Sequence, residues 1–149
     1  MTENFSYLLI DSGNGRKLER FGPYLLSRPC SQAVWQPQLS EKEWDAADAS
    51  FSREQENKWT WKKPLPSTWK IAVAGIQFKI SPTDFGHLGI FPEQLPVWEW
   101  LQKAIRKKAT PSFKPRVLNL FAYSGGSSLA AAKGGAAVCH LDASKGMVT

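Results

Sequence analysis

The sequence has 149 residues, of which 42% are hydrophobic and 21% are charged, and its formal net charge is +6. This composition is typical of a folded globular chain and excludes a disordered or fibrous one. No apolar run approaches the roughly 20 residues that a bilayer-spanning helix needs, and residues 1–12 lack the pattern of a secretory signal. We therefore expect no membrane segment. The two cysteines, Cys30 and Cys139, are far apart in the sequence and form no metal-type spacing, so we expect a reduced, cytoplasmic protein.

The positive charge favours an anionic partner, and nucleic acid is the first candidate. The basic residues are spread along the chain, however. An RNA-facing surface and a merely solvated exterior are therefore both compatible with the sequence.

In chain order, the first predicted elements are short strands at YLLIDS (residues 7–12) and PYLLSRP (residues 23–29), separated by a turn-forming Ser12–Gly15 stretch. A short helix is predicted from Ser40 to Ala47, because Ser40 and the glutamate three residues later have the spacing of a capping box. Further on, IAVAG and IQFKIS predict two paired strands around Gly75. These elements indicate a small β-rich N-terminal domain.

The stretch KWTWKKPLPSTW (residues 58–69) places three tryptophans among lysines and prolines. Aromatic side chains between lysines are typical of proteins that bind single-stranded RNA by base stacking. A domain this small, however, needs large apolar side chains in its core, and we favour this role. The tryptophans expected to be buried are Trp44, Trp59, Trp61 and Trp69.

The segment PVWEWLQKAIRKK (residues 96–108) has apolar residues at three- and four-residue spacing, which predicts an amphipathic helix. The basic residues at its end suit a helix C-terminus electrostatically. A proline-bearing connector, TPSFKPR, follows. The apolar face is expected to consist of Val97, Trp98, Leu101, Ala104 and Ile105.

Residues 117–142 have the pattern strand, glycine loop, helix, strand, acid. VLNLF is an apolar run typical of a buried parallel strand, and AAVCHL predicts a second one. Between them, Gly125–Gly126 permits a tight turn, Ser127 is predicted to cap the helix SLAAAK, and glycines 134–135 end it. Ligands of such sheets bind beyond the carboxyl ends of the strands, where both the glycine loop and Asp142 are expected.

The acid narrows the class of ligand. A carboxylate accepts more than one hydrogen bond, so Asp142 can bind both ribose hydroxyls of an adenosine with a free 2′-hydroxyl. The candidates are then a dinucleotide such as NAD, or S-adenosylmethionine (SAM). A dinucleotide favours G-x-G-x-x-G around its pyrophosphate, whereas this loop reads SGGSSL. SAM has no phosphate, so the loop fits SAM better; a purely structural turn is the remaining alternative.

A resemblance supports SAM. The stretch LNLFAYSGGSSLAAAKGGAAVCHLDASKGMV closely resembles the first two motifs of class I SAM-dependent methyltransferases. It is most similar to the bacterial family akin to large-subunit ribosomal RNA cytosine-5 methyltransferases, in which LFxYTGGxSLAAAxxGA…HVDxSK is typical; Ser124 stands for the usual threonine. Upstream, IDSGNGRKLERFGPYLLSRPCSQAVW is similar to the N-terminal strand region of that family.

The segment FGHLGIFPEQ is similar to the family's K-T-G-x-F-x-D-Q segment. His87 and Leu88 stand where lysine and threonine are usual, and Glu93 stands for aspartate. For His87 we favour a structural role over a catalytic one.

The resemblance implies that the glycine loop surrounds the methionine end of SAM. It also implies that the acid binds the ribose, that the next two residues lie beside the adenosine, and that the segment before the helix approaches the cofactor. The residues implied are, in that order, Tyr123, Ser124, Gly125 and Gly126; Asp142; Ala143 and Ser144; and Phe91 and Gln94.

The expected fold class is α/β, or α+β over the whole chain. We predict a small β-rich N-terminal domain (1–94), a linking helix and connector (95–116), and the first β-α-β unit of a Rossmann-like SAM-binding domain (117–149). The family's D-P-P-x-F motif, which faces the substrate, has no counterpart here. We therefore expect the N-terminal part of a methyltransferase, truncated and inactive alone, with no catalytic and no metal-binding residue assigned.

The predicted function is methyl transfer from SAM to RNA, and resemblance with charge favours ribosomal RNA. The alternative is a non-catalytic RNA-binding module. In that case the tryptophan–lysine stretch binds RNA and the βαβ unit is a remnant of a cofactor domain.

Overall fold

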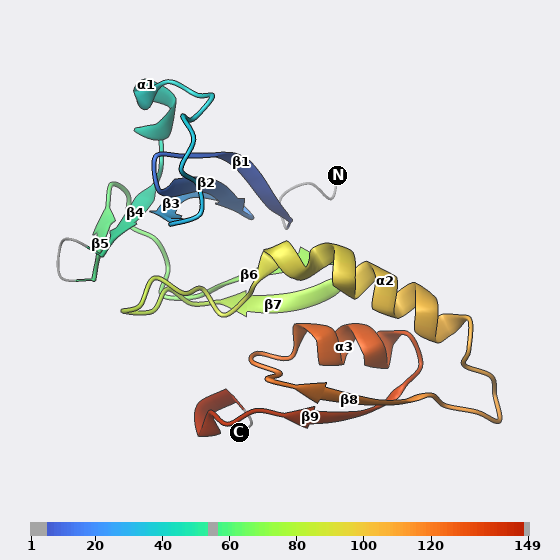
Figure 1. Cartoon of the computed structure of the whole chain (residues 1–149). Helices are drawn as coiled ribbons and strands as arrows, with labels where there is room; N and C mark the ends of the chain where they lie inside the picture. The colour runs from blue at the N-terminus through green and yellow to red at the C-terminus, as the bar shows by residue number, and fades with distance from the viewer. Residues whose placement is uncertain (1–5, 54–56, 148–149) are drawn as a thin grey trace. The chain divides into compact units, whose positions relative to one another are not determined.

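A computed structural model of the chain describes residues 6–53 and 57–147 (Figure 1). The chain forms two compact units. The first consists of Met1–Ala72 and Gln77–Gly89, and the second of Val73–Ile76 and Ile90–Thr149. The division into domains at residues 94 and 116 stays a prediction.

The first unit is built on a five-stranded sheet with the strand order β1-β2-β3-β4-β5. β1 (Tyr7–Gly13), β2 (Arg16–Phe21) and β3 (Tyr24–Pro29) form an antiparallel meander. β4 (Ala49–Ser52) pairs with β3 in parallel, and β5 (Lys58–Trp61) pairs with β4 antiparallel. The two predicted strands near the N-terminus are confirmed as β1 and β3.

β2 is a strand that the sequence pattern does not predict. Its sequence, RKLERF, is mostly charged, yet the side chain of Glu19 is fully buried. The Glu19 carboxylate forms an ion pair with Arg28 of β3 (2.7 Å) and accepts a hydrogen bond from the Tyr7 hydroxyl of β1 (3.0 Å). Asn14 and Gly15, with φ of 48° and 72°, turn the chain between β1 and β2. A paired buried charge thus stands where an apolar residue would have marked the strand.

The short helix α1 (Glu41–Trp44) begins where the capping box predicts. The backbone N–H and the hydroxyl of Ser40 both donate to the carboxylate of Glu43, at 2.9 and 2.8 Å. The helix ends earlier than the predicted Ala47. Its start is therefore confirmed and its predicted length is wrong.

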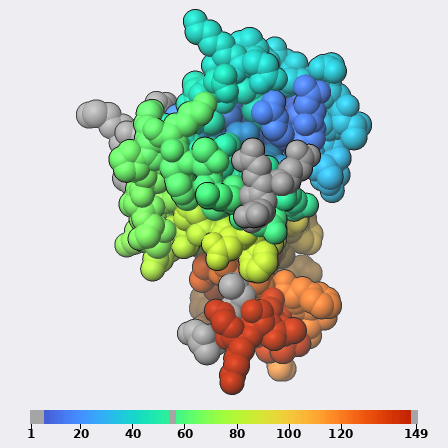
Figure 2. Space-filling view, turned by 90° about the vertical axis from the view of Figure 1, so that its left-hand side faces the viewer, coloured from blue at the N-terminus to red at the C-terminus, as the bar shows by residue number. Residues whose placement is uncertain are grey.

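The tryptophans differ in burial. Trp44 and Trp59 are 3% and 8% exposed, and Trp69 is half-buried; the indole N–H of each donates a hydrogen bond. For Trp61 the prediction of a core position is wrong, because this side chain is 44% exposed. Trp61 lies on the edge strand β5 and its ring stacks on Trp59, with centroids 5.1 Å apart, instead of entering the core. Figure 2 shows the segment around β5, in green, at the surface of the first unit.

β6 (Trp69–Val73) and β7 (Ile76–Ile80) form a two-stranded sheet. The residues between them, Ala74 and Gly75, have φ of 52° and 69°. Positive φ at both central residues is typical of a type I′ turn, whose twist matches that of the flanking strands. The predicted strand pair around Gly75 is therefore confirmed.

The second unit contains the elements η2 (Pro92–Gln94), α2 (Leu95–Arg106), β8 (Arg116–Leu120), α3 (Gly126–Lys133), β9 (Ala137–Leu141) and η3 (Lys145–Met147). The strands β8 and β9 are adjacent and parallel, with Leu118 opposite Cys139, and form a βαβ arrangement with α3. Figure 1 shows α3 between α2 and these strands. The predicted order of strand, loop, helix and strand is confirmed.

Two glycines, one at each end of α3, allow this helix to pack closely against α2. A Cβ at Gly126, the first residue of α3, would overlap the indole of Trp98, and a Cβ at Gly134, which caps the end of α3, would lie 2.9 Å from the Cβ of Ile105. Trp98 and Ile105 are only 3% and 6% exposed. The contact between the two helices therefore depends on the absence of side chains at these two positions.

The buried face of α2 is rotated from the predicted one. Val97, which the apolar spacing assigns to this face, is 43% exposed. Gln102 is buried instead, and its Nε2–H donates to the carbonyl oxygen of Ala74 (3.0 Å). A polar side chain with a backbone partner thus completes a face that the apolar pattern alone does not describe.

Cys30 is a half-buried free thiol and Cys139 is an exposed one. Over residues 6–53 and 57–147, no group of three or more His, Cys, Asp or Glu side chains is arranged to bind a metal ion. Over the same residues, no helix is both long and apolar enough to cross a membrane.

Candidate functional site

The loop between β8 and α3 contains strained backbone. Phe121 and Tyr123 have φ of 55° and 48°, in the left-handed region that side chains with a Cβ rarely adopt. Such a conformation costs about 1–3 kcal/mol and persists only where the surrounding structure imposes it, typically at functional sites. Phe121 is also 90% exposed, although the apolar run VLNLF predicts that it is a buried strand residue. The strand ends at Leu120, and the loop is a candidate binding element.

The start of α3 differs from the prediction. Gly125, with φ of 90°, is the N-cap residue and the helix begins at Gly126, so the prediction that Ser127 caps the helix is wrong. Only a residue without a Cβ adopts this φ without strain, and the chain can therefore enter the helix directly from the turn. The Ser127 hydroxyl accepts a hydrogen bond from Nε1–H of Trp98 instead, at 3.2 Å.

The carboxylate of Asp142 is fixed beside this loop, directly after β9. One oxygen accepts a hydrogen bond from the backbone N–H of Tyr123 (2.7 Å) and the other from the backbone N–H of Ser144 (2.8 Å). The hydrogen bond from Ser144, followed by that from Tyr123, holds the pKa of Asp142 below its ordinary value of 3.8. The side chain is therefore ionised at neutral pH. Because an ionised carboxylate has about four acceptor sites, each oxygen can accept a further hydrogen bond.

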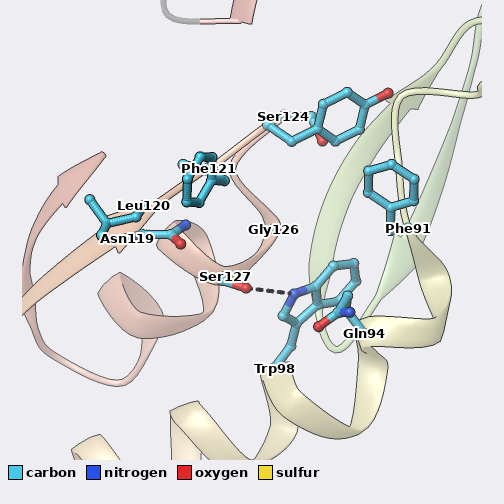
Figure 3. A pocket seen from close by; sticks show the side chains of 11 residues that line it. Phe91, Gln94, Trp98, Asn119, Leu120, Phe121, Ser124, Gly126 and Ser127 are labelled. Atoms are coloured by element: carbon cyan, nitrogen blue, oxygen red, sulfur yellow. Dashed lines mark hydrogen bonds between the residues drawn. The ribbon is translucent and has the colours of Figure 1, made fainter. Parts of the chain in front are cut away.

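A cavity of about 330 Å³ lies between the loop and the segment that leads into α2. In Figure 3, Phe91 and Gln94 lie on one side of it, and Asn119 and Phe121 on the other. The rings of Phe91 and Tyr123 are 4.7 Å apart at an interplanar angle of 41°. The lining residues are Phe91, Gln94, Trp98, Asn119, Leu120, Phe121, Ala122, Tyr123, Ser124, Gly126 and Ser127.

A second cavity, of about 270 Å³, lies at the carboxyl ends of β8 and β9. It is lined by Leu120, Phe121, Leu141, Asp142 and Ala143. Leu120 and Phe121 line both cavities, so the two cavities adjoin each other at the end of β8. The site thus has one compartment with polar groups from the loop and one that is apolar except for the acid.

The nine residues predicted to bind a cofactor lie in or next to these two cavities, and their role in binding stays a prediction. The first cavity contains Phe91, Gln94, Tyr123, Ser124 and Gly126; the second contains Asp142 and Ala143; Gly125 caps α3; and Ser144 donates its N–H to Asp142.

Further residues of the site are not found by sequence reasoning. Trp98 has the spacing of a core residue in an amphipathic helix, yet its indole lines the first cavity and donates a hydrogen bond to Ser127 in the first turn of α3. Asn119 interrupts the apolar run of β8, and this interruption is the one signal in the sequence that could have indicated a special position. Phe121 has no such signal, because its exposure follows from the loop backbone.

Comparisons with known proteins place the fold. No family model matches the chain, and no curated protein is significantly similar to it. The chain is similar to the crystal structure of a SAM-dependent methyltransferase from Agrobacterium tumefaciens, with 44% sequence identity and a TM-score of 0.85 over 95% of this chain and 45% of that one. It has the fold of part of a SAM-dependent methyltransferase.

Two more distant structures agree on the fold. One is described as a SAM-dependent methyltransferase from Streptococcus mutans, with 20% identity and a TM-score of 0.69 over 97% of this chain and 40% of that one. The other is described as a methyltransferase complexed with SAH, with 20% identity and a TM-score of 0.68 over the same shares. This chain spans less than half of the length of each of the three proteins. The predicted class is confirmed as a mixed α/β fold with a small β-rich part and a partial Rossmann-like domain.

Proposed function

We propose that this chain provides the SAM-binding part of a methyltransferase. The observation that carries the proposal is the Asp142 carboxylate, which two backbone N–H groups fix beside a glycine loop and two cavities. The similarity to the A. tumefaciens enzyme, with 44% identity over 95% of this chain, supports it. An ionised carboxylate, held in place at the end of the second parallel strand, can accept hydrogen bonds from the hydroxyls of an adenosine ribose.

The two cavities fit the two ends of SAM. Asp142 would accept hydrogen bonds from both ribose hydroxyls, and the apolar second cavity beside Ala143 and Ser144 would take the adenine. The methionine end would lie in the first cavity, whose volume of about 330 Å³ is within the ordinary range for ligand sites, about 300–1,000 Å³. The residues that would surround the methionine end are Tyr123, Ser124, Gly125, Gly126, Phe91 and Gln94.

The loop sequence favours SAM over a dinucleotide. Since the pKa of Asp142 is lowered, mainly by the N–H groups of Ser144 and Tyr123, its carboxylate is ionised at neutral pH and can accept the ribose hydroxyls of either cofactor. The loop SGGSSL lacks the G-x-G-x-x-G pattern that surrounds a pyrophosphate, and SAM has no phosphate. When bound, SAM supplies a methyl group that the sulfonium already activates. The residues of this chain bind and orient it, and none is proposed as catalytic.

We further propose that the methyl acceptor is RNA, and by resemblance ribosomal RNA. The net charge of +6 supports an anionic substrate. Trp61, stacked on Trp59 and 44% exposed on the edge strand of the first unit, provides a surface on which a base could stack next to Lys58 and Lys62. An RNA substrate and two free thiols both favour a cytoplasmic location.

Calorimetric titration of the 149-residue chain with SAH tests cofactor binding. Asp142→Ala removes two acceptors of charge-assisted hydrogen bonds, so we expect SAH affinity to fall about 10- to 100-fold. Asp84→Ala, at an exposed aspartate of the first unit, is the matched control and should leave the affinity unchanged. Equal affinity of wild type and Asp142→Ala would contradict the proposal.

A second arm of this experiment uses a single-stranded RNA oligonucleotide and fluorescence anisotropy. If Trp61 stacks on a base, Trp61→Ala should weaken RNA binding about 5- to 100-fold. The exposed side chain Trp35 provides the control variant Trp35→Ala. RNA binding by a wild-type chain that does not bind SAH would favour the alternative, a non-catalytic RNA-binding module.

A further inference from the structure

A chain of three polar side chains joins the strands and the helix of the βαβ unit. Asn119 of β8 and His140 of β9 are opposite each other in the parallel pair. Nδ2–H of Asn119 donates to Oγ of Ser128 in the first turn of α3 (2.9 Å), and the same oxygen lies 3.0 Å from Nδ1 of His140. Ser128 is only 8% exposed. Its hydroxyl can accept from Asn119 and donate to His140 at the same time.

The imidazole of His140 also lies against the glycine loop. A Cβ at Gly125 would lie 3.4 Å from Cε1 and 3.6 Å from Nδ1 of the ring, so the ring edge contacts the residue that caps α3. Nε2 is buried and has no hydrogen-bond partner among the described residues. Nδ1 alone therefore connects this ring to α3 by a hydrogen bond.

These contacts place His140 beneath the candidate site without making it part of the lining. His140 lines neither cavity, whereas Asn119 and Ser127, the neighbour of Ser128, both line the first one. Asp142 follows His140 by two residues and accepts a hydrogen bond from the N–H of Tyr123, which lies in the loop before α3. A buried polar network that is satisfied in only one arrangement specifies that arrangement. The network therefore fixes the first turn of α3 relative to the end of β9.

We propose that His140 is a positioning residue of the SAM site. Through the bond between Nδ1 and Ser128 Oγ, it holds the first turn of α3, and with it the loop, where Tyr123 N–H meets Asp142. This inference rests on the proposed function, because it assigns the purpose of the held loop to SAM binding. His140 acts through Ser128 and does not touch the cofactor.

The two nitrogens of the ring can be tested separately by amide side chains. His140→Asn places a polar atom near the position of Nδ1, whereas His140→Gln places one near the position of Nε2. We expect His140→Asn to retain SAH affinity within about twofold, and His140→Gln to weaken it about five- to tenfold, the effect of one lost hydrogen bond. Ser128→Ala also removes the bond from Asn119, so it should weaken the affinity at least as much. The double variant of His140→Gln and Ser128→Ala should be no weaker than Ser128→Ala, because that substitution already removes the bond to His140.

Amide hydrogen exchange over residues 123–129 gives a readout without SAH. Protection should fall in His140→Gln and Ser128→Ala and return in His140→Asn. Cys139→Ser, an exposed neighbour on β9, is the control and should change neither readout. Ser128→Ala removes a single oxygen and keeps the test valid if His140→Gln does not fold.

The outcomes separate the two proposals. Equal behaviour of the Asn and Gln variants, or SAH affinity and loop protection of Ser128→Ala equal to those of wild type, would overturn the positioning role and leave the proposed function intact. Absence of SAH binding by wild type would instead overturn the proposed function for this chain. The exchange rates would then decide alone: rescue of loop protection by asparagine supports the positioning role, and no rescue overturns it.

Discussion

The five-stranded sheet of the first unit and the β8–β9 sheet of the second unit differ in how they cover their side chains. In the five-stranded sheet, β2, β3 and β4 each have neighbours on both sides, and Leu18, Phe21 and Leu26 are at most 1% exposed. In the two-stranded sheet of the second unit, Leu118 and Leu120 of β8 are 60% and 51% exposed. One face of that sheet is covered by α3 and the other contains exposed apolar side chains.

This difference leads us to expect that the first sheet contributes mainly to stability and the second mainly to binding. The first sheet buries apolar side chains, which are the main source of folding free energy, and a charge pair that is costly to break by removal of one partner. The second carries the candidate site at the carboxyl ends of its strands, with a loop strained at Phe121 and Tyr123. Binding elements are generally drawn from the less stable parts of a protein. We therefore expect substitutions in the first sheet to cost more stability than substitutions on the outer face of the second.

The largest effect is expected for Glu19→Ala in β2. This substitution leaves Arg28, 8% exposed, without its carboxylate partner at 2.7 Å, and an uncompensated buried charge costs about 3–5 kcal/mol. Glu41→Ala breaks an exposed ion pair with Arg16 (3.3 Å) and should cost less than about 1 kcal/mol. Urea unfolding followed by tryptophan fluorescence measures both. Equal costs would contradict the view that burial of the charge makes the first sheet sensitive.

The next largest effect distinguishes the faces of the two sheets. Leu26→Ala in β3 empties a fully buried position and should cost about 2–5 kcal/mol of unfolding free energy. Leu118→Ala in β8 truncates a side chain that is 60% exposed and should change stability by about 0.5 kcal/mol or less. Thermal unfolding of the two variants provides the measurement. A cost for Leu118→Ala comparable with that for Leu26→Ala would mean that the outer face of β8 is covered in solution.

The parts of the fold that the sequence predicts are those with local signals. The Ser40–Glu43 capping box and the turn at Gly75 depend on side chains a few residues apart, and both are present. β2 is not predicted, because Glu19 is stabilised by Arg28 and Tyr7 from neighbouring strands. A partner that only tertiary structure brings close leaves no mark in the local pattern.

The candidate site divides in the same way. The strand–loop–helix–strand–acid motif places the glycine loop and Asp142 together, and the structure shows them joined through the N–H of Tyr123. Trp98 is missed because its contact with Gly126 joins two helices that are distant in the sequence. The exposure of Trp61 is missed because β5 is an edge strand, and strand order is not encoded in residue spacing.

The smallest effect on stability is expected from the titration of Asp142, a half-buried acid of the second unit. The N–H groups of Ser144 and then Tyr123 hold the pKa of this carboxyl below 3.8 in the folded chain, while the unfolded chain has the ordinary value. A lowered pKa contributes stability that is fully present above the unfolded value and is lost as the pH falls through the folded value. Loop stability and SAH affinity should therefore be constant near neutral pH and fall only in acid below about 3.8.

The amide proton shifts of Tyr123 and Ser144 report this titration directly, because both N–H groups donate to the carboxylate. We expect both shifts to move together, with a midpoint below 3.8, and Asp142→Asn to abolish the transition. A midpoint at or above 3.8 would show that the two hydrogen bonds do not hold the charge. Asp142 would then be no better ordered than a surface aspartate. The second unit would in that case lack the fixed acid that the proposed SAM site needs.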